Sequence, residues 1–276
     1  MKKLAFLGPE GTFTQQAAKE YCRRSPREMV ECASIPDVIW AVASGEAEEG
    51  LVPIENSIEG AVNATLDMLA HEVDLFIIAE LVLQVHQCLM ARGPIRLEDI
   101  TDVFSHPQAL AQCQRFIHDK LSRSKTHTTY STAAAAKIVA EGKNTWAAIA
   151  MPSAAQNWGL VILAEDIQDM PDNATRFVVL SKEPVLPSGR SKTSIIFSVK
   201  DEPGGLYNAL KIFADKGINL TRIESRPAKK MLGQYLFFVD FLGSSQEKSV
   251  RECLETLSKS SSFYKYLGSY PAWDEG

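Results

Sequence analysis

The chain has 276 residues, of which 45% are hydrophobic, and its formal net charge is −5 from 29 basic and 34 acidic residues. This length can bury at least one substantial core and favours a larger domain with a smaller partner. The acidic balance, without a basic run, disfavours nucleic acid and membrane surfaces as partners, so an anionic ligand must be bound by local polar groups.

The five cysteines are widely spaced and form no CxxC pair. This argues against a disulfide framework and a zinc site, and it favours a reducing compartment. The N-terminal apolar run ends at Gly8-Pro9, short of an export segment, and no stretch approaches the roughly 18 apolar residues of a membrane span. We therefore expect a cytoplasmic protein.

From residue 2 to about residue 180, short apolar runs alternate with amphipathic ones, which predicts strands and helices around a mostly parallel sheet. The run from Leu75 to Met90 is too long for one ordinary strand, and we expect it to be a hinge crossing between two lobes. The expected strands cover residues 3–8, 29–34, 50–54, 74–90, 102–106, 126–131, 145–150 and 176–181.

Residues 183–192, EPVLPSGRSK, combine two prolines with Ser, Gly and charge, and they lack periodicity. This composition predicts a linker between a domain of residues 1–182 and a domain of residues 193–276. After the linker, the pattern reads strand, helix, strand, strand, helix, strand. That order is typical of a ferredoxin-like βαββαβ sandwich.

Three predicted helices begin just after short strands, in LGPEGTFTQQA, SHPQALAQC and YSTAAAA. Their first turns would present Thr12, Ser105 and Ser131 with free backbone N–H groups at the positive end of a helix dipole, which suits carboxylates. The alternative is that each hydroxyl only caps its helix. Gln112 follows Gln108 by about one helical turn, so both amides can lie on one side of that helix.

Polar residues also follow the apolar strand in VPIENSIEG, where Glu55, Asn56 and Ser57 are candidates for ligand binding. They can instead form a capping box with Glu59. In DNATRF, Asn173-Ala174-Thr175 can be a glycosylation site, or Thr175 and Arg176 can stand at the mouth of a strand. A cytoplasmic location disfavours glycosylation.

The sequence has no Gly-rich phosphate motif, no nucleophile elbow and no clustered metal ligands. These absences favour a protein without a cofactor that handles a small anion with hydroxyls, amides and one or two carboxylates. Taken together, the motifs closely resemble those of the monofunctional bacterial prephenate dehydratase family, which carries a C-terminal ACT regulatory domain. The matching stretches, in the family's order, are GPEGTFT, VPIENSIEG, SHPQALAQC, YSTAAAA, NATRF, GGLYNAL and ESRP.

The resemblance implies an α/β fold with a two-lobed catalytic domain similar to periplasmic binding proteins, and a reaction that converts prephenate to phenylpyruvate. Thr175 would assist the departure of hydroxide. The residues implied to act with it in catalysis are Glu55, Asn56, Ser105 and Gln112. Those implied to bind or shape the substrate are Thr12, Ser57, Ser131, Arg176 and Phe177.

For the ACT domain, the resemblance implies L-phenylalanine as allosteric effector at the interface of a homodimer or homotetramer. Gly205 replaces the alanine usual in the family. We expect a chain cut near Ser188 to keep catalysis and lose the L-phenylalanine response. The implied effector-binding residues are Gly204, Gly205, Leu206, Asn219, Glu224 and Ser225.

Two alternatives stay open. An arogenate dehydratase would use the same motifs and yield phenylalanine directly. A solute-binding protein would share the two-lobed fold without catalysing a reaction, although such proteins are normally exported.

Overall fold

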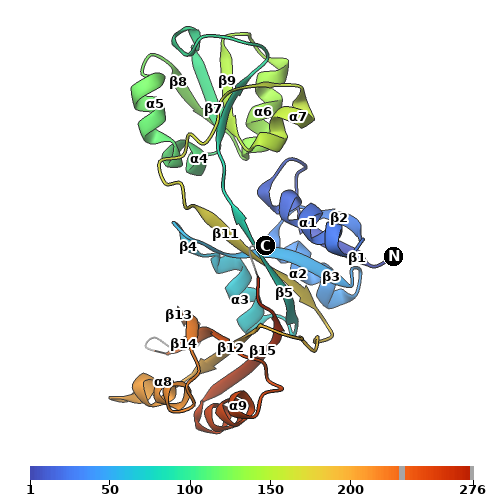
Figure 1. Cartoon of the computed structure of the whole chain (residues 1–276), viewed down its shortest axis with the longest axis vertical. Helices are drawn as coiled ribbons and strands as arrows, with labels where there is room; N and C mark the ends of the chain where they lie inside the picture. Colours follow the sequence, from blue (N-terminus) through green and yellow to red (C-terminus); the bar gives the residue numbers. More distant parts are fainter. Residues whose placement is uncertain (230–233, 274–276) are drawn as a thin grey trace.

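The computed structural model describes residues 1–229 and 234–273, in which three sheets lie one above another along the long axis. Figure 1 shows one lobe at the top, a second lobe in the middle that contains the N-terminus, and a C-terminal domain at the bottom. No helix within these described ranges is long and apolar enough to cross a membrane.

The middle lobe is built on a sheet with strand order β2-β1-β3-β11-β5, and the short β4 pairs with β3. Its first three strands are parallel, but β11 runs antiparallel to both β3 and β5. The elements of this lobe are β1 (Lys3–Leu7), α1 (Phe13–Arg24), β2 (Glu28–Cys32), α2 (Ile35–Ser44), β3 (Glu49–Asn56), β4 (Gly60–Ala61), α3 (Asn63–His71), β5 (Phe76–Gln84) and β11 (Ala174–Ser181).

The upper lobe has a second sheet with strand order β10-β6-β9-β7-β8. Only β9, β7 and β8 pair in parallel, so both sheets are mixed and the expectation of a mostly parallel sheet was wrong. Its elements are β6 (Cys88–Ala91), the 3₁₀ helix η1 (Leu97–Asp99), β7 (Asp102–Ser105), α4 (Pro107–Gln112), α5 (Gln114–Lys120), β8 (Lys125–Thr128), α6 (Thr132–Glu141), β9 (Trp146–Ala150), α7 (Pro152–Trp158) and β10 (Val161–Ala164).

Two segments connect the lobes. The apolar run expected as one long strand is divided into β5 and β6, with residues 85–87 crossing between the sheets, and residues 165–173 return. The two crossings are bonded to each other, because the Val85 N–H donates to the Asn173 carbonyl (2.7 Å) and the Ile167 N–H donates to the Gln87 carbonyl (3.0 Å). The chain therefore joins the lobes through a paired, two-stranded hinge.

The C-terminal domain has the predicted βαββαβ order, with a four-stranded antiparallel sheet in the order β13-β14-β12-β15. Gly233, where the predicted third strand begins, lies outside the described residues. The last strand of the middle lobe ends at Ser181 and β12 begins at Ser191. The elements are β12 (Ser191–Ser198), α8 (Gly205–Asp215), β13 (Leu220–Pro227), β14 (Tyr235–Leu242), α9 (Lys248–Ser260) and β15 (Phe263–Pro271).

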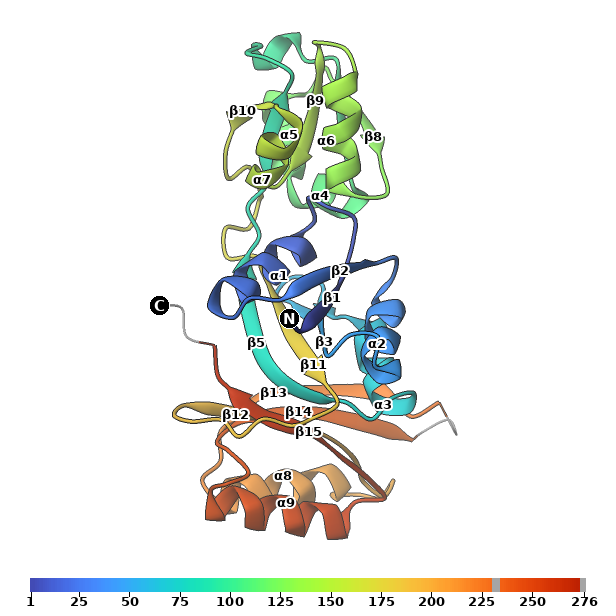
Figure 2. The same ribbon diagram turned by 90° about the vertical axis from the view of Figure 1, so that its right-hand side faces the viewer.

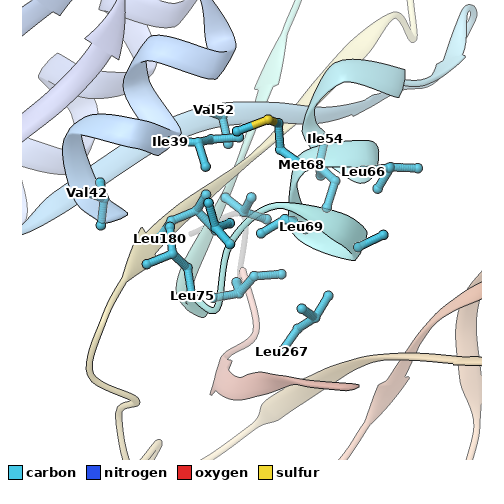
Figure 3. Close-up of a cluster of buried hydrophobic side chains, with 14 of the residues drawn as sticks. Ile39, Val42, Val52, Ile54, Leu66, Met68, Leu69, Leu75, Leu180 and Leu267 are labelled. Carbon is cyan, nitrogen blue, oxygen red and sulfur yellow. The ribbon is translucent and has the colours of Figure 1, made fainter. Parts of the chain in front are cut away.

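This sheet has two covered faces. Helices α8 and α9 pack on one face, and the other lies against the middle lobe (Figure 2). Leu267 of β15 belongs to the same buried cluster as Leu75 and Leu180, and Figure 3 shows the three side chains close together. Because the cluster continues across the boundary, a chain cut near Ser188 would expose apolar surface. This argues against the expectation that catalysis survives the cut.

Candidate active site

A cavity of about 670 Å³ lies between the upper and middle lobes. The middle lobe contributes the ends of β1 and β3 and the starts of β11, α1 and α3, and the upper lobe contributes the starts of α4 and α6. The described residues that line it are Leu7, Gly8, Pro9, Thr12, Phe13, Thr14, Ala33, Pro53, Asn56, Glu59, Gly60, Ala61, Val62, Val85, Gln87, His106, Gln108, Ala109, Gln112, Tyr130, Ser131, Thr132, Thr175 and Phe177.

Strand pairing brings two of the predicted residues together. In the antiparallel register of β3 and β11, Asn56 lies opposite Thr175. The Asn56 Nδ2 group donates to Thr175 Oγ1 (3.0 Å) and to Asn173 Oδ1 (2.9 Å). The capping-box alternative was wrong, because residues 57–59 form a turn between β3 and β4 and start no helix. Asn56 Oδ1 stabilises this turn by accepting from the N–H groups of Ile58 and Glu59, both at 3.0 Å. Those two N–H groups fix which end of the amide faces Thr175.

This arrangement sets the direction of the Thr175 hydroxyl. Its oxygen accepts a hydrogen bond from Asn56, so its own hydrogen is left to donate elsewhere. Thr175 is half-buried and lines the cavity. A ligand oxygen in the cavity can therefore accept the Thr175 O–H.

Helix starts surround the same cavity. Thr12 caps α1, because its Oγ1 accepts from the Gln15 N–H (3.3 Å), and Gln15 Oε1 accepts from the N–H of Gly11, the residue before the cap (2.8 Å). Ser131 caps α6 by accepting from the Ala134 N–H (3.0 Å). Both caps stand at the cavity wall, and the unpaired first-turn N–H groups of these helices carry partial positive charge.

The described lining residues include no Lys or Arg, and Glu59 is their one carboxylate. The positive potential in the cavity therefore comes from helix ends and polar hydrogens. His106 Nδ1 accepts from the Gln108 N–H (3.3 Å), so its other ring nitrogen carries the proton when the ring is neutral. The cavity wall thus has a ring N–H donor at His106, in addition to the Thr175 hydroxyl and the N–H groups of the helix starts.

Gln87 is a cavity residue that the sequence analysis missed. It is 2% exposed and lies on the crossing between β5 and β6. Its Nε2 makes a long contact of 3.5 Å with Oε1 of the predicted residue Gln112, and its own Oε1 is buried without a partner among the described residues. A buried acceptor with no partner costs free energy unless a ligand pairs with it.

Glu55 and Arg176 do not line the cavity. They lie opposite each other in the strand register, on the face of the sheet away from Asn56 and Thr175. Adjacent residues of a strand point to opposite faces of the sheet. Glu55 therefore cannot share a face with Asn56, and Arg176 cannot share a face with Thr175. Arg176 contacts Glu80 and Asp240, and Glu55 contacts Arg222.

Ser57 and Ser105 also lie outside the cavity lining. Ser57 Oγ accepts from the Ala174 N–H (2.9 Å), which ties two loops together. Ser105 is fully buried and donates to the Ile149 carbonyl (2.6 Å), between strands β7 and β9.

Asn173 is also fully buried, which rules out the glycosylation alternative in this fold. Six predicted residues do line the cavity: Thr12, Asn56, Gln112, Ser131, Thr175 and Phe177.

The residues expected to bind an effector fall into two groups. Gly204, Gly205 and Leu206 form the start of α8, and Gly205 lines a separate hollow of about 450 Å³. Asn219 is exposed and precedes β13, while Glu224 and Ser225 lie on β13 and are not among the residues lining that hollow. By strand alternation, Glu224 shares the face of Arg222 that looks toward the middle lobe, and Ser225 is on the other face.

Together these features define a class of protein. Two α/β lobes enclose a polar cleft lined by helix starts, and a βαββαβ domain packs on the back of one lobe. A sequence profile described as prephenate dehydratase matches residues 4–185, and one described as ACT domain matches residues 193–258. The chain belongs to the prephenate dehydratase family and carries a C-terminal ACT domain.

Similar proteins agree with this assignment. The bifunctional chorismate mutase/prephenate dehydratase of Aquifex aeolicus is 45% identical over 98% of this chain and 73% of its own length. The prephenate dehydratase of Methanocaldococcus jannaschii is 40% identical and covers 99% of both chains. The crystal structure of an Arthrobacter aurescens prephenate dehydratase in complex with L-Phe has a TM-score of 0.90 and 38% identity, over 99% of this chain and 91% of that one. The predicted family and fold class are thus confirmed.

Proposed function

We propose that this protein converts prephenate to phenylpyruvate, carbon dioxide and water in the cleft between its lobes. The observation that carries the proposal is the hydrogen bond from Asn56 to Thr175, which leaves the Thr175 hydroxyl hydrogen for a ligand. Membership of the prephenate dehydratase family supports the same chemistry.

The cavity suits a dianion. Prephenate carries two carboxylates, and the starts of α1 and α6 offer N–H groups together with the Ser131 hydroxyl. The Thr12 hydroxyl donates to the Leu7 carbonyl (3.4 Å). A buried Lys or Arg would hold the ring carboxylate too firmly, because decarboxylation needs that group to lose its charge. Neutral donors orient it while leaving its conversion to carbon dioxide less opposed.

The reaction breaks two bonds of the ring. The electron pair of the C–C bond to the ring carboxylate moves into the ring, carbon dioxide departs, and the C–O bond to the ring hydroxyl breaks. The departing hydroxide takes up one proton and leaves as water, so the ring becomes aromatic. Thr175 donates a hydrogen bond to this leaving oxygen, since a threonine hydroxyl is too weak an acid to act as the final proton source.

Gln87 supplies the complementary contact. Prephenate has a single hydrogen-bond donor, its ring hydroxyl, and the unpaired Gln87 Oε1 is an acceptor buried in the cavity wall. We assign this pair to the bound state, with Thr175 donating to the same hydroxyl oxygen. The arrangement holds the leaving group from two sides.

We further propose that L-phenylalanine inhibits the enzyme through its ACT domain, in a cytoplasmic homodimer or homotetramer. Phenylpyruvate is one transamination from phenylalanine, and the Arthrobacter aurescens enzyme was crystallised with L-Phe. The candidate contacts are the start of α8 at Gly204 and the outer face of β13 at Ser225. The outer face is the face of β13 that is turned away from the middle lobe.

A product assay tests the catalytic proposal. Purified protein is given prephenate and arogenate in parallel, before and after dialysis against a chelator, and phenylpyruvate and phenylalanine are quantified. We expect phenylpyruvate from prephenate with equal rates in both preparations. Phenylalanine from arogenate alone would instead establish the arogenate alternative, and a rate restored only by added metal would contradict a cofactor-free reaction.

A further inference from the structure

The two strands that present Asn56 and Thr175 to the cavity present Glu55 and Arg176 to the ACT domain. Glu55 and Arg176 are paired across β3 and β11, directly beside the pair Asn56 and Thr175. Each catalytic side chain is thus one peptide unit away from a charged side chain on the other face of the sheet. A movement of the ACT sheet that displaces Arg176 or Glu55 would shift the backbone that holds the catalytic pair.

Arg176 is the centre of a buried network that spans the two domains. Its Nη1 lies 2.5 Å from Asp240 Oδ2 of β14, its Nη2 donates to the Tyr270 hydroxyl of β15 (2.9 Å), and its Nε donates to Glu80 Oε2 of β5 (2.8 Å). Asp240 is also held by the Ser194 hydroxyl of β12 (2.5 Å). Three of the four ACT strands therefore take part in holding one guanidinium group.

A second connection runs through β13. Arg222 Nε lies 3.3 Å from Glu55 Oε2. Farther along the same face of β13, Arg226 Nη2 lies 2.9 Å from Asp67 Oδ1 of α3. Arg226 also donates to the side chain of Asn63, the first residue of α3, which follows the cavity residue Val62. The outer face of the same strand carries Ser225, one of the candidate effector contacts.

The network is costly to break. Burial opposes the charge of Arg176, but Asp240 and the other neighbouring groups raise the pKa of its guanidinium above its usual value. Burial likewise acts against ionised Asp240, yet Arg176 and Arg222 lower the pKa of this carboxyl overall. Removing one partner leaves another buried charge without compensation, so the contacts favour one arrangement of the domains.

We propose that Asp240 and Arg222 of the ACT domain are positioning residues for catalysis: through Arg176 and Glu55 they fix the alignment of Thr175 and Asn56 in the cavity. This rests on the proposed function and adds a physical route for its regulation. An effector that binds the outer face of β13 and moves that strand would loosen these contacts and misalign the catalytic hydroxyl. Misplacement by about 1 Å can cost roughly 10²-fold in rate.

The test uses full-length Asp240→Asn, which keeps the size of the side chain and removes its charge. We expect kcat to fall about tenfold while KM changes less than about twofold, because the substrate contacts remain but the alignment of Thr175 is lost. The L-phenylalanine concentration for half inhibition should shift by about fivefold or more, since the effector acts through the same contacts. Tyr270→Phe removes one of the Arg176 contacts and should lower kcat by about threefold, again with little change in KM.

Glu49→Gln is the matched control. Glu49 is 2% exposed and pairs with Arg27 (2.9 Å) at the start of β3, at the opposite end of the strand from Asn56, so its loss also removes a buried charge. If the network only supports the fold, the control and Asp240→Asn should behave alike at equal loss of thermal stability. Unchanged kcat and L-phenylalanine response in both Asp240→Asn and Tyr270→Phe would overturn the inference. No turnover by the unaltered protein would instead refute the proposed function, and the inference with it.

Discussion

Asn56 donates a hydrogen bond to Thr175 across two antiparallel strands, with Nδ2 and Oγ1 3.0 Å apart. Because the amide oxygen is already occupied by two backbone N–H groups, Asn56 acts toward Thr175 only as a donor. Replacing Asn56 with Asp keeps the acceptor for those N–H groups but turns the partner of Thr175 into an acceptor. The hydroxyl hydrogen would then point at the carboxylate and away from the substrate.

We therefore expect Asn56→Asp to lower kcat by about two orders of magnitude, the scale for losing an assisting donor. It should also lower thermal stability, because Asn173 Oδ1 and the Ala174 carbonyl lose their donor and face a carboxylate. Steady-state kinetics with prephenate and a melting curve measure the two quantities. A rate within about threefold of the unaltered enzyme would show that the direction of this hydrogen bond is unimportant.

Gln87→Met should have opposite effects on activity and stability. It removes a buried acceptor that has no hydrogen-bond partner in residues 1–229 and 234–273, so the protein should become slightly more stable. It also removes the proposed contact to the substrate hydroxyl, and kcat/KM should fall about tenfold, the equivalent of about 1.4 kcal/mol. If kcat/KM stays unchanged, Gln87 does not contact the substrate.

The pH dependence of the unfolding free energy should show how much the ionised Glu49 carboxylate stabilises the fold. Burial acts to raise the pKa of its carboxyl, but Arg27, Tyr21 and Lys2 lower it overall. A folded pKa below the unfolded value of about 4.3 means that the unfolded state binds more protons in the acid range. The stabilisation is fully present above the unfolded pKa and is lost as the pH falls through the folded pKa. The difference in unfolding free energy between the parent and Glu49→Gln should therefore narrow below about pH 4, and a constant difference would contradict this.

Gly205→Ala tests the departure from the usual family residue. An added Cβ would lie 2.6 Å from the Lys200 carbonyl oxygen, so the loop before α8 must shift to accept it. We expect a cost of about 1 kcal/mol, or a melting temperature lower by about 2–4 °C. Gly93→Ala is the control, because its Cβ would meet no atom within 4 Å. Equal melting temperatures for the two variants would show that the loop adapts without cost.

The sequence was sufficient to predict the βαββαβ order of the C-terminal domain and six of the residues that line the cavity. The βαββαβ pattern and the capped helix starts at Thr12 and Ser131 depend on local periodicity and capping, which are written in adjacent residues. The pairing of β3 with β11 joins residues 119 positions apart, and no local pattern specifies it. Strand alternation alone would have shown that Glu55 and Asn56 cannot face the same cavity. Gln87 gave no signal, because a glutamine in an interlobe crossing resembles any polar loop residue.

The most direct test of the account is the rate of phenylpyruvate formation from prephenate by Thr175→Ala and Thr175→Ser beside the unaltered enzyme. Thr175 lines the cavity and is aligned by Asn56. The account predicts that the alanine variant loses about two to four orders of magnitude in kcat with an intact fold, while the serine variant, which keeps the hydroxyl, retains much of the rate. An alanine variant within about threefold of the unaltered enzyme would contradict the central role of this hydroxyl.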